Sequence, residues 1–418
     1  MPKRPATIRD LRRASRATVL RELWFDGPLS RQDVSARTTV SAATVSNVVS
    51  ELLAEGVVAE VGQVASDGGR PAVLVGVRPG FGSVVGIDVS ESGVVVELFD
   101  VALDWSATIE RSLGHRAPDP HEILALAAAA TADVLAKAGK TAEDVLGVGV
   151  GVPGLVEDDA ESIVHAPSLG WQGVPFATLL EQATGIPVAL DNGAKALARA
   201  EAWFGAGNGA QNLIVCLIGS GVGAAILAEG RLFRGATGSA GEWGHTTAVI
   251  DGRPCRCGAR GCLQAYVGSE AILERWAEAA GEPTADGVSE EQAIEALLAA
   301  AEAGEGPARD VLDETALYLG VALADIINLL NPDRVVLGGW VGLRLGPELL
   351  PRISAHAQKA SLAAPFSRVE LDLCHLGPDA VARGAATLVI ERFLSSGGTP
   401  MTIDPAVRAA GRVTGVTG

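Results

Sequence analysis

The stretch that decides the fold runs from residue 241 to residue 264 and reads GEWGHTTAVIDGRPCRCGARGCLQ. It brings one histidine, His245, and three cysteines, Cys255, Cys257 and Cys262, within 18 residues. Three thiolates and one imidazole complete a tetrahedral zinc shell, and the glycines between Cys257 and Cys262 allow a tight turn. Because the protein supplies all four ligands, we expect a structural zinc ion with no open position for a catalytic water. The alternative is a group of unligated thiols.

The remaining composition favours a cytoplasmic protein. The five cysteines are an odd number, which is poor evidence for disulfides. No stretch reaches the roughly 18 uninterrupted apolar residues that a membrane helix needs, and the basic N-terminus is not followed by the apolar core of a signal peptide. We therefore expect no membrane contact. At 418 residues the chain is long enough for two or three compact units.

The first 77 residues are predicted to form a winged helix-turn-helix. An apolar helical stripe stops at Gly27-Pro28, and Ser30 then caps a second helix with Asp33 in capping-box spacing. A third helix follows Ser41, and two apolar strand runs joined by a Gly-containing turn predict a two-stranded wing. The alternative is a small three-helix domain that packs on the body of the chain.

Short polar side chains line the exposed face of this third helix. Such side chains let the backbone approach the floor of the major groove, and Asn47 has the donor and acceptor needed to pair with adenine. An arginine at the tip of the wing could contact a phosphate or the minor groove. The predicted DNA contacts are Arg31, Ser41, Thr44, Ser46, Asn47 and Arg70.

The charge distribution is compatible with this interpretation. The net charge is -17, but residues 1–80 contain 11 Lys and Arg against 8 Asp and Glu, which leaves -20 for the remainder. A mildly basic head on an acidic body fits a DNA-binding head whose body is kept off the phosphates.

The body is predicted to be α/β, with apolar strands that lead into glycine-rich loops. The strand Leu213–Ile218 runs into Gly219–Gly223, and a later strand runs into Gly338-Gly339. Glycine at the carboxyl end of a strand lets backbone amides face a ligand. These loops indicate a cleft that binds, or once bound, a nucleotide and a small polar molecule. The first strands and helix are expected at 84–89, 94–99, 121–138 and 145–152.

The Gly-Glu-Trp-Gly-His and Cys-x-Cys-Gly-x-x-Gly-Cys-Leu motifs resemble the signature of the ROK family of repressors and sugar kinases, and the resemblance spans about residues 10–395. It implies a winged helix-turn-helix followed by a two-lobed, actin-like (ribonuclease-H-like) domain, with a sugar between the lobes. The histidine would hold zinc with one ring nitrogen and face a sugar hydroxyl with the other. The implied sugar contacts are Gly154, Ser168, Asn192, Glu242, His245 and Gln264.

Four positions depart from the kinases of that family. Gly193 stands where they carry the aspartate that acts as general base, and losing a positioned base typically costs about 10²–10⁴ in rate. Glu91 lies in the first phosphate loop, where the kinases carry Gly-Gly-Thr and where it would repel phosphate, and Trp340 follows the Gly338-Gly339 loop. Gln264 replaces a glutamate but can still bind a hydroxyl. We therefore expect no catalytic residues. We also expect that the pocket still binds a sugar.

These observations predict a sugar-responsive repressor that binds operator DNA as a homodimer or a dimer of dimers, because paired half-sites need two-fold symmetry. Two alternatives are an active ATP-dependent sugar kinase with an appended head, and a regulator that senses a protein partner. The expected divisions are a DNA-binding domain at 1–77, a linker at 78–82, a sugar-sensing domain at 83–398 and a flexible tail at 399–418.

Overall fold

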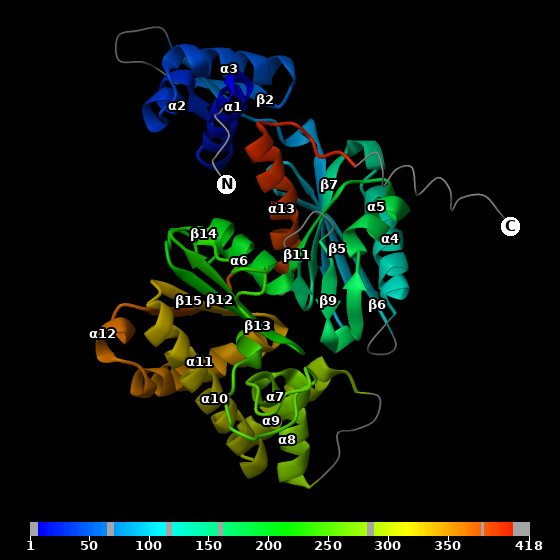
Figure 1. The fold of residues 1–418 in the computed structure, drawn as a ribbon, viewed down its shortest axis with the longest axis vertical. Helices are drawn as coiled ribbons and strands as arrows, with labels where there is room; N and C mark the ends of the chain where they lie inside the picture. The colour runs from blue at the N-terminus through cyan, green and yellow to red at the C-terminus, as the bar shows by residue number, and fades with distance from the viewer. Residues whose placement is uncertain are drawn as a thin grey trace, which may run out of the picture.

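The computed structural model describes residues 7–64, 71–113, 119–157, 162–281, 288–377 and 380–403, which form an N-terminal head and two larger lobes (Figure 1). The predicted wing-tip contact Arg70 lies outside the described residues. None of the described helices combines the length and apolar composition needed to cross a bilayer.

The head contains the three predicted helices and one strand more than predicted. Ser30 accepts from the Asp33 backbone N–H, and Asp33 accepts from that of Ser30, which is the expected capping box. Ser41 caps the third helix by accepting from the N–H of Thr44, without the reciprocal bond of a capping box. A two-residue strand pairs with the C-terminal strand of the hairpin, so the sheet has three antiparallel strands in the order β1-β3-β2. The elements are α1 (Ile8–Phe25), β1 (Leu29–Ser30), α2 (Arg31–Arg37), α3 (Ala42–Ala54), β2 (Val58–Val64) and β3 (Ala72–Val77).

The first lobe is built on a five-stranded sheet in the order β11-β7-β4-β5-β6. The prediction missed β6, the outer strand of an antiparallel meander, and its exposed, polar side chains explain why its apolar signal was weak. The elements are β4 (Ser83–Val89), β5 (Gly93–Asp100), β6 (Trp105–Ser112), α4 (Pro120–Lys137), β7 (Val145–Val152), α5 (Phe176–Thr184), β11 (Val188–Asn192) and α6 (Gly193–Phe204). A small sheet of β8 (Leu155–Val156), β9 (Val164–Ala166) and β10 (Trp171–Val174) is attached to it.

The second lobe repeats this topology in a second five-stranded sheet of order β14-β13-β12-β15-β16. Its strands are β12 (Leu213–Ile218), β13 (Val222–Ala228), β14 (Arg231–Leu232), β15 (Arg334–Gly338) and β16 (Glu370–Leu373), and its helices are α7 (Gln264–Val267), α8 (Ser269–Ala280), α9 (Glu290–Ala303), α10 (Gly306–Leu330), α11 (Trp340–Ala360) and α12 (Ala363–Phe366). In each sheet three antiparallel strands are followed by two parallel ones. The predicted two-lobed α/β architecture is therefore confirmed.

The segment around residues 280–308 is not the small exposed insertion that its Ala- and Glu-rich sequence suggests. It contains α9, in which Ile294 and Leu297 are fully buried in the core of the second lobe. The few large apolar residues of α9 lie on one face of the helix. This face packs in the core, although the overall composition, rich in Ala and Glu, is typical of an exposed helix.

The C-terminal helix α13 (Ala380–Ser396) returns to the first lobe and links it to the head (Figure 1). One apolar cluster contains Leu20 and Leu52 of the head together with Phe393 and Leu394 of α13. The Trp24 indole N–H also donates to the Val101 carbonyl of the first lobe. The head is therefore packed on the body and shares a core with it.

The segments expected to be a linker and a flexible tail contribute to this junction. Phe81, in the turn Pro79–Phe81, lies 5.6 Å from Phe393 between ring centroids. The tail prediction was wrong at its start, because Ile403 is only 6% exposed and Met401 packs on the same cluster. Apolar side chains hold residues 399–403 against the body, while residues 404–418 lie outside the described part of the chain.

Replacing Gly149 with alanine is expected to destabilise the first lobe. A Cβ there would lie 1.9 Å from the Ala385 carbonyl oxygen of α13, so strand and helix would have to separate. Overpacking of this kind costs about 1–3 kcal/mol or more. Urea denaturation followed by circular dichroism should show a lower midpoint. Gly80→Ala is the matched control, because nothing lies within 4 Å of a Cβ at that position, and equal midpoints for the two variants would contradict the expectation.

Candidate functional site

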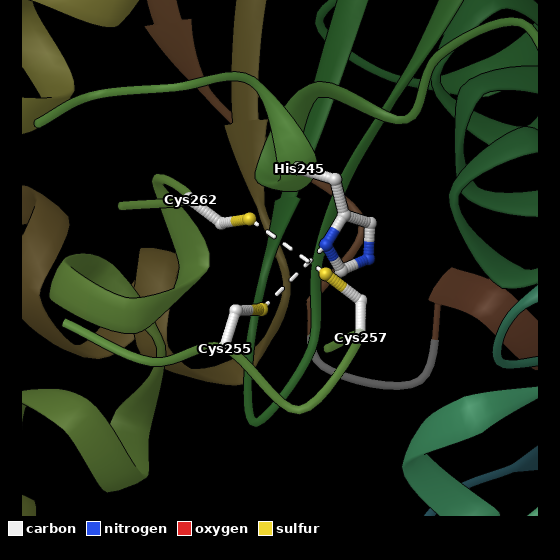
Figure 2. Close-up of side chains that lie close together, drawn as sticks. All are labelled: His245, Cys255, Cys257 and Cys262. Atoms are coloured by element: carbon white, nitrogen blue, oxygen red, sulfur yellow. Dashed lines mark hydrogen bonds between the residues drawn. The ribbon is translucent and has the colours of Figure 1, made fainter. Parts of the chain in front are cut away.

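The predicted metal-binding residues come together on one side of the second lobe. His245 lies in the 3-10 turn Trp243–His245, and Cys255, Cys257 and Cys262 lie in the loop that follows (Figure 2). The four ligand atoms lie within 4.8 Å of one another. The loop is closed by the Cys255 N–H, which donates to the Ala259 carbonyl at 2.8 Å, and by the Gly261 N–H, which donates to Arg253. Gly261 has a φ of +75°, and a Cβ there would meet the Val249 carbonyl, as expected of a glycine that permits a tight turn.

The cluster has the dimensions of a tetrahedral zinc site. A zinc–sulfur bond of about 2.3 Å implies a separation of about 3.8 Å between two ligand atoms. The Cys257 and Cys262 sulfurs are 3.7 Å apart, and the Cys255 sulfur is 3.8 Å from His245 Nδ1. Figure 2 shows one ring nitrogen of His245 turned toward the sulfurs and the other turned away. The residues therefore fit a metal ion that leaves the second imidazole nitrogen available.

The three thiols of the cluster differ in acidity. Burial, with hydrogen bonds from its neighbours, raises the pKa of Cys262 to about 12, and burial also raises the pKa of Cys255. Burial acts in the same direction on Cys257, but hydrogen bonds from the Ala259 backbone and the neighbouring thiols outweigh it and lower the pKa of Cys257. Outside the cluster, burial raises the pKa of Cys374 to about 12 and also that of the core thiol Cys216, so both remain protonated.

Two of the predicted sugar contacts, Asn192 and Gly154, touch each other. The Asn192 side chain donates to the Gly154 carbonyl at 2.6 Å, and its oxygen accepts from the first backbone N–H groups of α6. Gly154 has a φ of +81°, and a Cβ there would meet the His165 carbonyl. Asn192 therefore has a structural role that the sequence interpretation missed: it caps α6 and fixes the turn at Gly154.

The other predicted sugar contacts occupy three places. Glu242 precedes the turn that carries His245, and its exposed carboxylate has no hydrogen-bond or ion-pair partner among the described residues. The Gln264 side chain accepts from the Val222 backbone N–H at 3.0 Å, so it braces the glycine-rich loop after β12. Ser168 is half-buried in the 3-10 turn Pro167–Leu169, and among the described residues no hydrogen bond joins it to the others. Its place in a sugar pocket remains a prediction.

A cavity of about 630 Å³ opens between the cysteine loop and α8. Gln264 is the one predicted sugar contact that lines it, and Arg253 and Arg256 form part of its charged wall. Arg253 is itself held by Glu274 and Glu278 of α8. The cavity thus lies beside the metal cluster and apart from Asn192 and Gly154.

Three departures from a kinase pattern lie in the turn after β4 and at the starts of α6 and α11. Glu91, in the turn between β4 and β5, is 8% exposed and forms an ion pair with Arg256. The ring of Trp340 lies against Gly219, since a Cβ at that glycine would be 3.3 Å from the indole. Gly193 is the first residue of α6, next to Asn192. The indole of Trp340 therefore lies against the turn after β12, and the turn after β4 carries an ion pair.

Sequence reasoning missed two polar contacts beside Asn192. Asp191 is fully buried and paired with Arg234, which comes from beyond β14 in the second lobe. Lys195 of α6 is 2% exposed and donates to the Gly238 carbonyl. Both contacts join residues 43 positions apart, so no local spacing indicates them. They hold the two lobes together at α6.

The predicted DNA-contact face of α3 is exposed. Ser46 and Asn47 point away from the buried residues Val45, Val48 and Val49. Ser41 and Thr44 bond to each other at the N-terminus of the helix, so part of their hydrogen-bonding capacity is used for capping. Arg31, the first residue of α2, is half-buried. The structure therefore presents Ser46 and Asn47 as the free side chains of this face.

Some known proteins match only the body of this chain, and others match the head as well. The model of the ROK family matches residues 84–392, which excludes the head. A glucokinase from Halalkalibacterium halodurans is 36% identical over 60% of this chain and 78% of its own. The xylose repressor of Caldicellulosiruptor bescii is 32% identical over 92% of this chain and 97% of that protein.

A solved structure agrees over the same length. The crystal structure of a ROK family transcriptional regulator, a homologue of the Escherichia coli MLC protein, superposes with a TM-score of 0.77 and 26% identity. The match covers 93% of this chain and 98% of that one. The similarity to a regulator thus includes both the head and the two lobes.

Proposed function

Because this chain belongs to the ROK family, we propose that it is a sugar-responsive transcriptional repressor whose head binds operator DNA as a winged helix-turn-helix. The observation that carries the proposal is the extent of the match: the named repressor aligns over 97% of its length, head included, whereas the glucokinase aligns with 60% of this chain. The exposed polar face of α3 supplies the chemistry for reading bases. We expect a dimer, because one head reads few base pairs.

We further propose that the Cys/His cluster holds one structural zinc ion. Three sulfurs and one imidazole nitrogen at tetrahedral spacing support zinc. Bound zinc would tie the turn that presents Glu242 and His245 to the cysteine loop, and it would fix the tautomer of His245. The second imidazole nitrogen of His245 and the exposed carboxylate of Glu242 are the groups we propose for the sugar hydroxyls, with Gln264, Asn192, Gly154 and Ser168 as the remaining contacts.

Kinase activity is lost in this proposal. Glycine at position 193 offers no base for the sugar hydroxyl. Glu91 and Trp340 fill the turns that would hold phosphate and base. An assay for ADP release, with common hexoses and Mg-ATP, is expected to give no turnover. Gly193→Asp should also fail: a Cβ there has 3.7 Å of clearance, so the residue fits, but the nucleotide site stays filled. Turnover at ordinary kinase rates by either protein would overturn this part of the proposal.

We propose that α13 transmits the sugar signal to the head. Near its start, Val381 faces the ends of β7 and β11: a Cβ at Gly151 would lie 2.8 Å from Val381 Cγ1, and one at Gly193 would lie 3.7 Å away. At its other end, the Arg16 guanidinium of the head donates to the Gly397 carbonyl, and Arg21 pairs with Glu391 at 3.0 Å. A sugar that changes the angle between the lobes would therefore move α13, and with it the surface on which the head packs.

A thermal-shift screen against aldoses and N-acetylhexosamines, without ATP, tests the sugar pocket. A sugar at about 100 times its dissociation constant should stabilise the protein by about 2.7 kcal/mol and raise the melting temperature. Glu242→Gln should abolish the shift without lowering the melting temperature of the sugar-free protein, because Glu242 has no partner to lose among the described residues. If no sugar raises the melting temperature, the regulator that senses a protein partner becomes the better hypothesis.

Titration of operator DNA completes the test. The operator is first selected from a random duplex library with the full-length protein. The stabilising sugar should then change the dissociation constant for that operator by about 5- to 150-fold, the usual range of coupling between two sites. An operator affinity that is unchanged at saturating sugar would contradict the proposed coupling.

A further inference from the structure

The turn after β4 and the glycine-rich turn after β12 are joined by one side chain, Arg256. Its guanidinium lies 2.8 Å from the Glu91 carboxylate, and its other terminal nitrogen donates to the Ser220 carbonyl at 3.1 Å. Glu91 belongs to the first lobe, in the turn between β4 and β5, whereas Ser220 follows β12 in the second lobe. The contact between Glu91 and Arg256 therefore spans the two lobes and 165 residues of sequence.

The two turns occupy equivalent places in the repeated topology. β4 and β12 are the third strands in the orders β6-β5-β4-β7-β11 and β14-β13-β12-β15-β16, and each is followed by one of the turns. Turns at the carboxyl ends of such strands are where an open α/β sheet binds phosphate groups. In this chain the space between them holds a cation of the protein itself.

The environment of Arg256 holds it in that place. Its backbone lies between two residues of the metal cluster, in the loop closed by the Cys255 and Gly258 N–H groups. Glu270, at the start of α8, lies 3.7 Å from its Nε. The Glu91 carboxyl is 9% exposed, and a charge removed from water to this extent requires a partner. The pair is therefore more than a solvated surface contact.

We propose that Arg256 is an interlobe latch: it takes the place that nucleotide phosphates would occupy between the turns at Glu91 and Ser220, and it holds the lobes together without a nucleotide. The lobes are already joined at α6, through Asp191–Arg234 and Lys195, so the latch provides a second attachment at the turns. The angle between the lobes then depends on the Glu91–Arg256 pair as well as on the contacts at α6. This inference does not depend on the identity of a sugar or of an operator.

Hydrogen–deuterium exchange of the full-length protein tests the latch without sugar or DNA. Glu91→Gln keeps the shape of the side chain and removes its charge. We expect exchange in peptides covering residues 219–223 of the opposite lobe to become about tenfold faster, as an opening equilibrium shifts when an ion pair is lost. Asp133→Asn is the matched control, because it breaks the exposed Arg111–Asp133 pair within the first lobe and should leave residues 219–223 unchanged.

A charge reversal separates a latch from a local disturbance. The double variant Glu91→Arg, Arg256→Glu re-forms the pair in the opposite sense. It should restore part of the slow exchange in residues 219–223 that Glu91→Arg alone loses, because it lacks the bond to the Ser220 carbonyl and sets a carboxylate beside Glu270. The bound metal and the far-ultraviolet circular dichroism of each variant are measured alongside, and Glu91→Gln should match the unchanged protein in both. Faster exchange of Glu91→Gln confined to residues 89–93, or no rescue by the double variant, would overturn the proposal.

Discussion

Replacing Cys257 with serine is expected to abolish zinc retention and to lower the melting temperature by about 10 °C or more. Binding of structural zinc contributes about 10–16 kcal/mol in isolated zinc modules, and a large part of this is folding free energy. A hydroxyl at position 257 removes one of four ligands. Because Cys257 is exposed, the substitution itself disturbs little packing. The effect should therefore report the loss of the metal.

The measurement combines metal content and thermal melting. Purified protein should hold one zinc ion per chain, and Cys257→Ser should hold none. Ala259→Ser is the matched control: it adds a hydroxyl at an exposed position of the same turn that supplies no ligand side chain. A chelator should lower the melting temperature of the unchanged protein to that of Cys257→Ser, and added zinc should restore it. Full zinc content and an unchanged melting temperature in Cys257→Ser would refute the assignment.

Replacing Asn47 with alanine should weaken operator binding by about 5- to 150-fold, which corresponds to the 1–3 kcal/mol that a bidentate contact to a base provides. Asn47 lies on the exposed face of α3 and contributes nothing to the apolar core of the head. Its loss should therefore leave the melting temperature unchanged. Ser46→Glu should have a larger effect, because a carboxylate on this face is repelled by the phosphates.

Fluorescence anisotropy with the selected operator measures both effects. Thr18→Ala is the matched control, because Thr18 is exposed on α1 and, among the described residues, its side chain bonds only to the Ala14 carbonyl of its own helix. The salt dependence of binding shows which kind of contact Asn47 makes. Asn47→Ala should keep the slope of affinity against salt concentration, since no phosphate contact is lost. An operator affinity equal to that of the unchanged protein in both variants would remove α3 from the interface.

Local patterns predicted the features that depend on short stretches of chain. The capping box of Ser30 and Asp33 is complete within four residues, and the turn around Gly258 and Gly261 follows from the spacing of the cysteines. The two-lobed architecture followed from the family resemblance, whereas the two five-stranded sheets and their strand orders came only from the structure, because short strands alone do not specify their order. The strand β6 was missed since it is polar on much of its surface.

Contacts between distant segments could not be predicted in this way. Glu91 was interpreted as a charge that repels phosphate, but the structure pairs it with Arg256, which lies 165 residues away in the sequence. Asn192 was interpreted as a sugar contact, and the structure adds its capping of α6, which needs the three-dimensional position of Gly154. Burial and pairing of polar groups depend on the packing of lobes, which no single segment encodes.

The shared core of head and body has a consequence for protein engineering. Leu20 and Leu52 are completely buried, and α13 and Gly398 contribute to their cover: they share a cluster with Phe393 and Leu394, and a Cβ at Gly398 would lie 3.2 Å from the Leu20 side chain. A chimera that joins this head to another sensor at residues 78–82 would therefore leave that apolar surface uncovered. A workable graft would have to carry the last turns of α13 and the segment after it, so the exchangeable module is discontinuous in sequence.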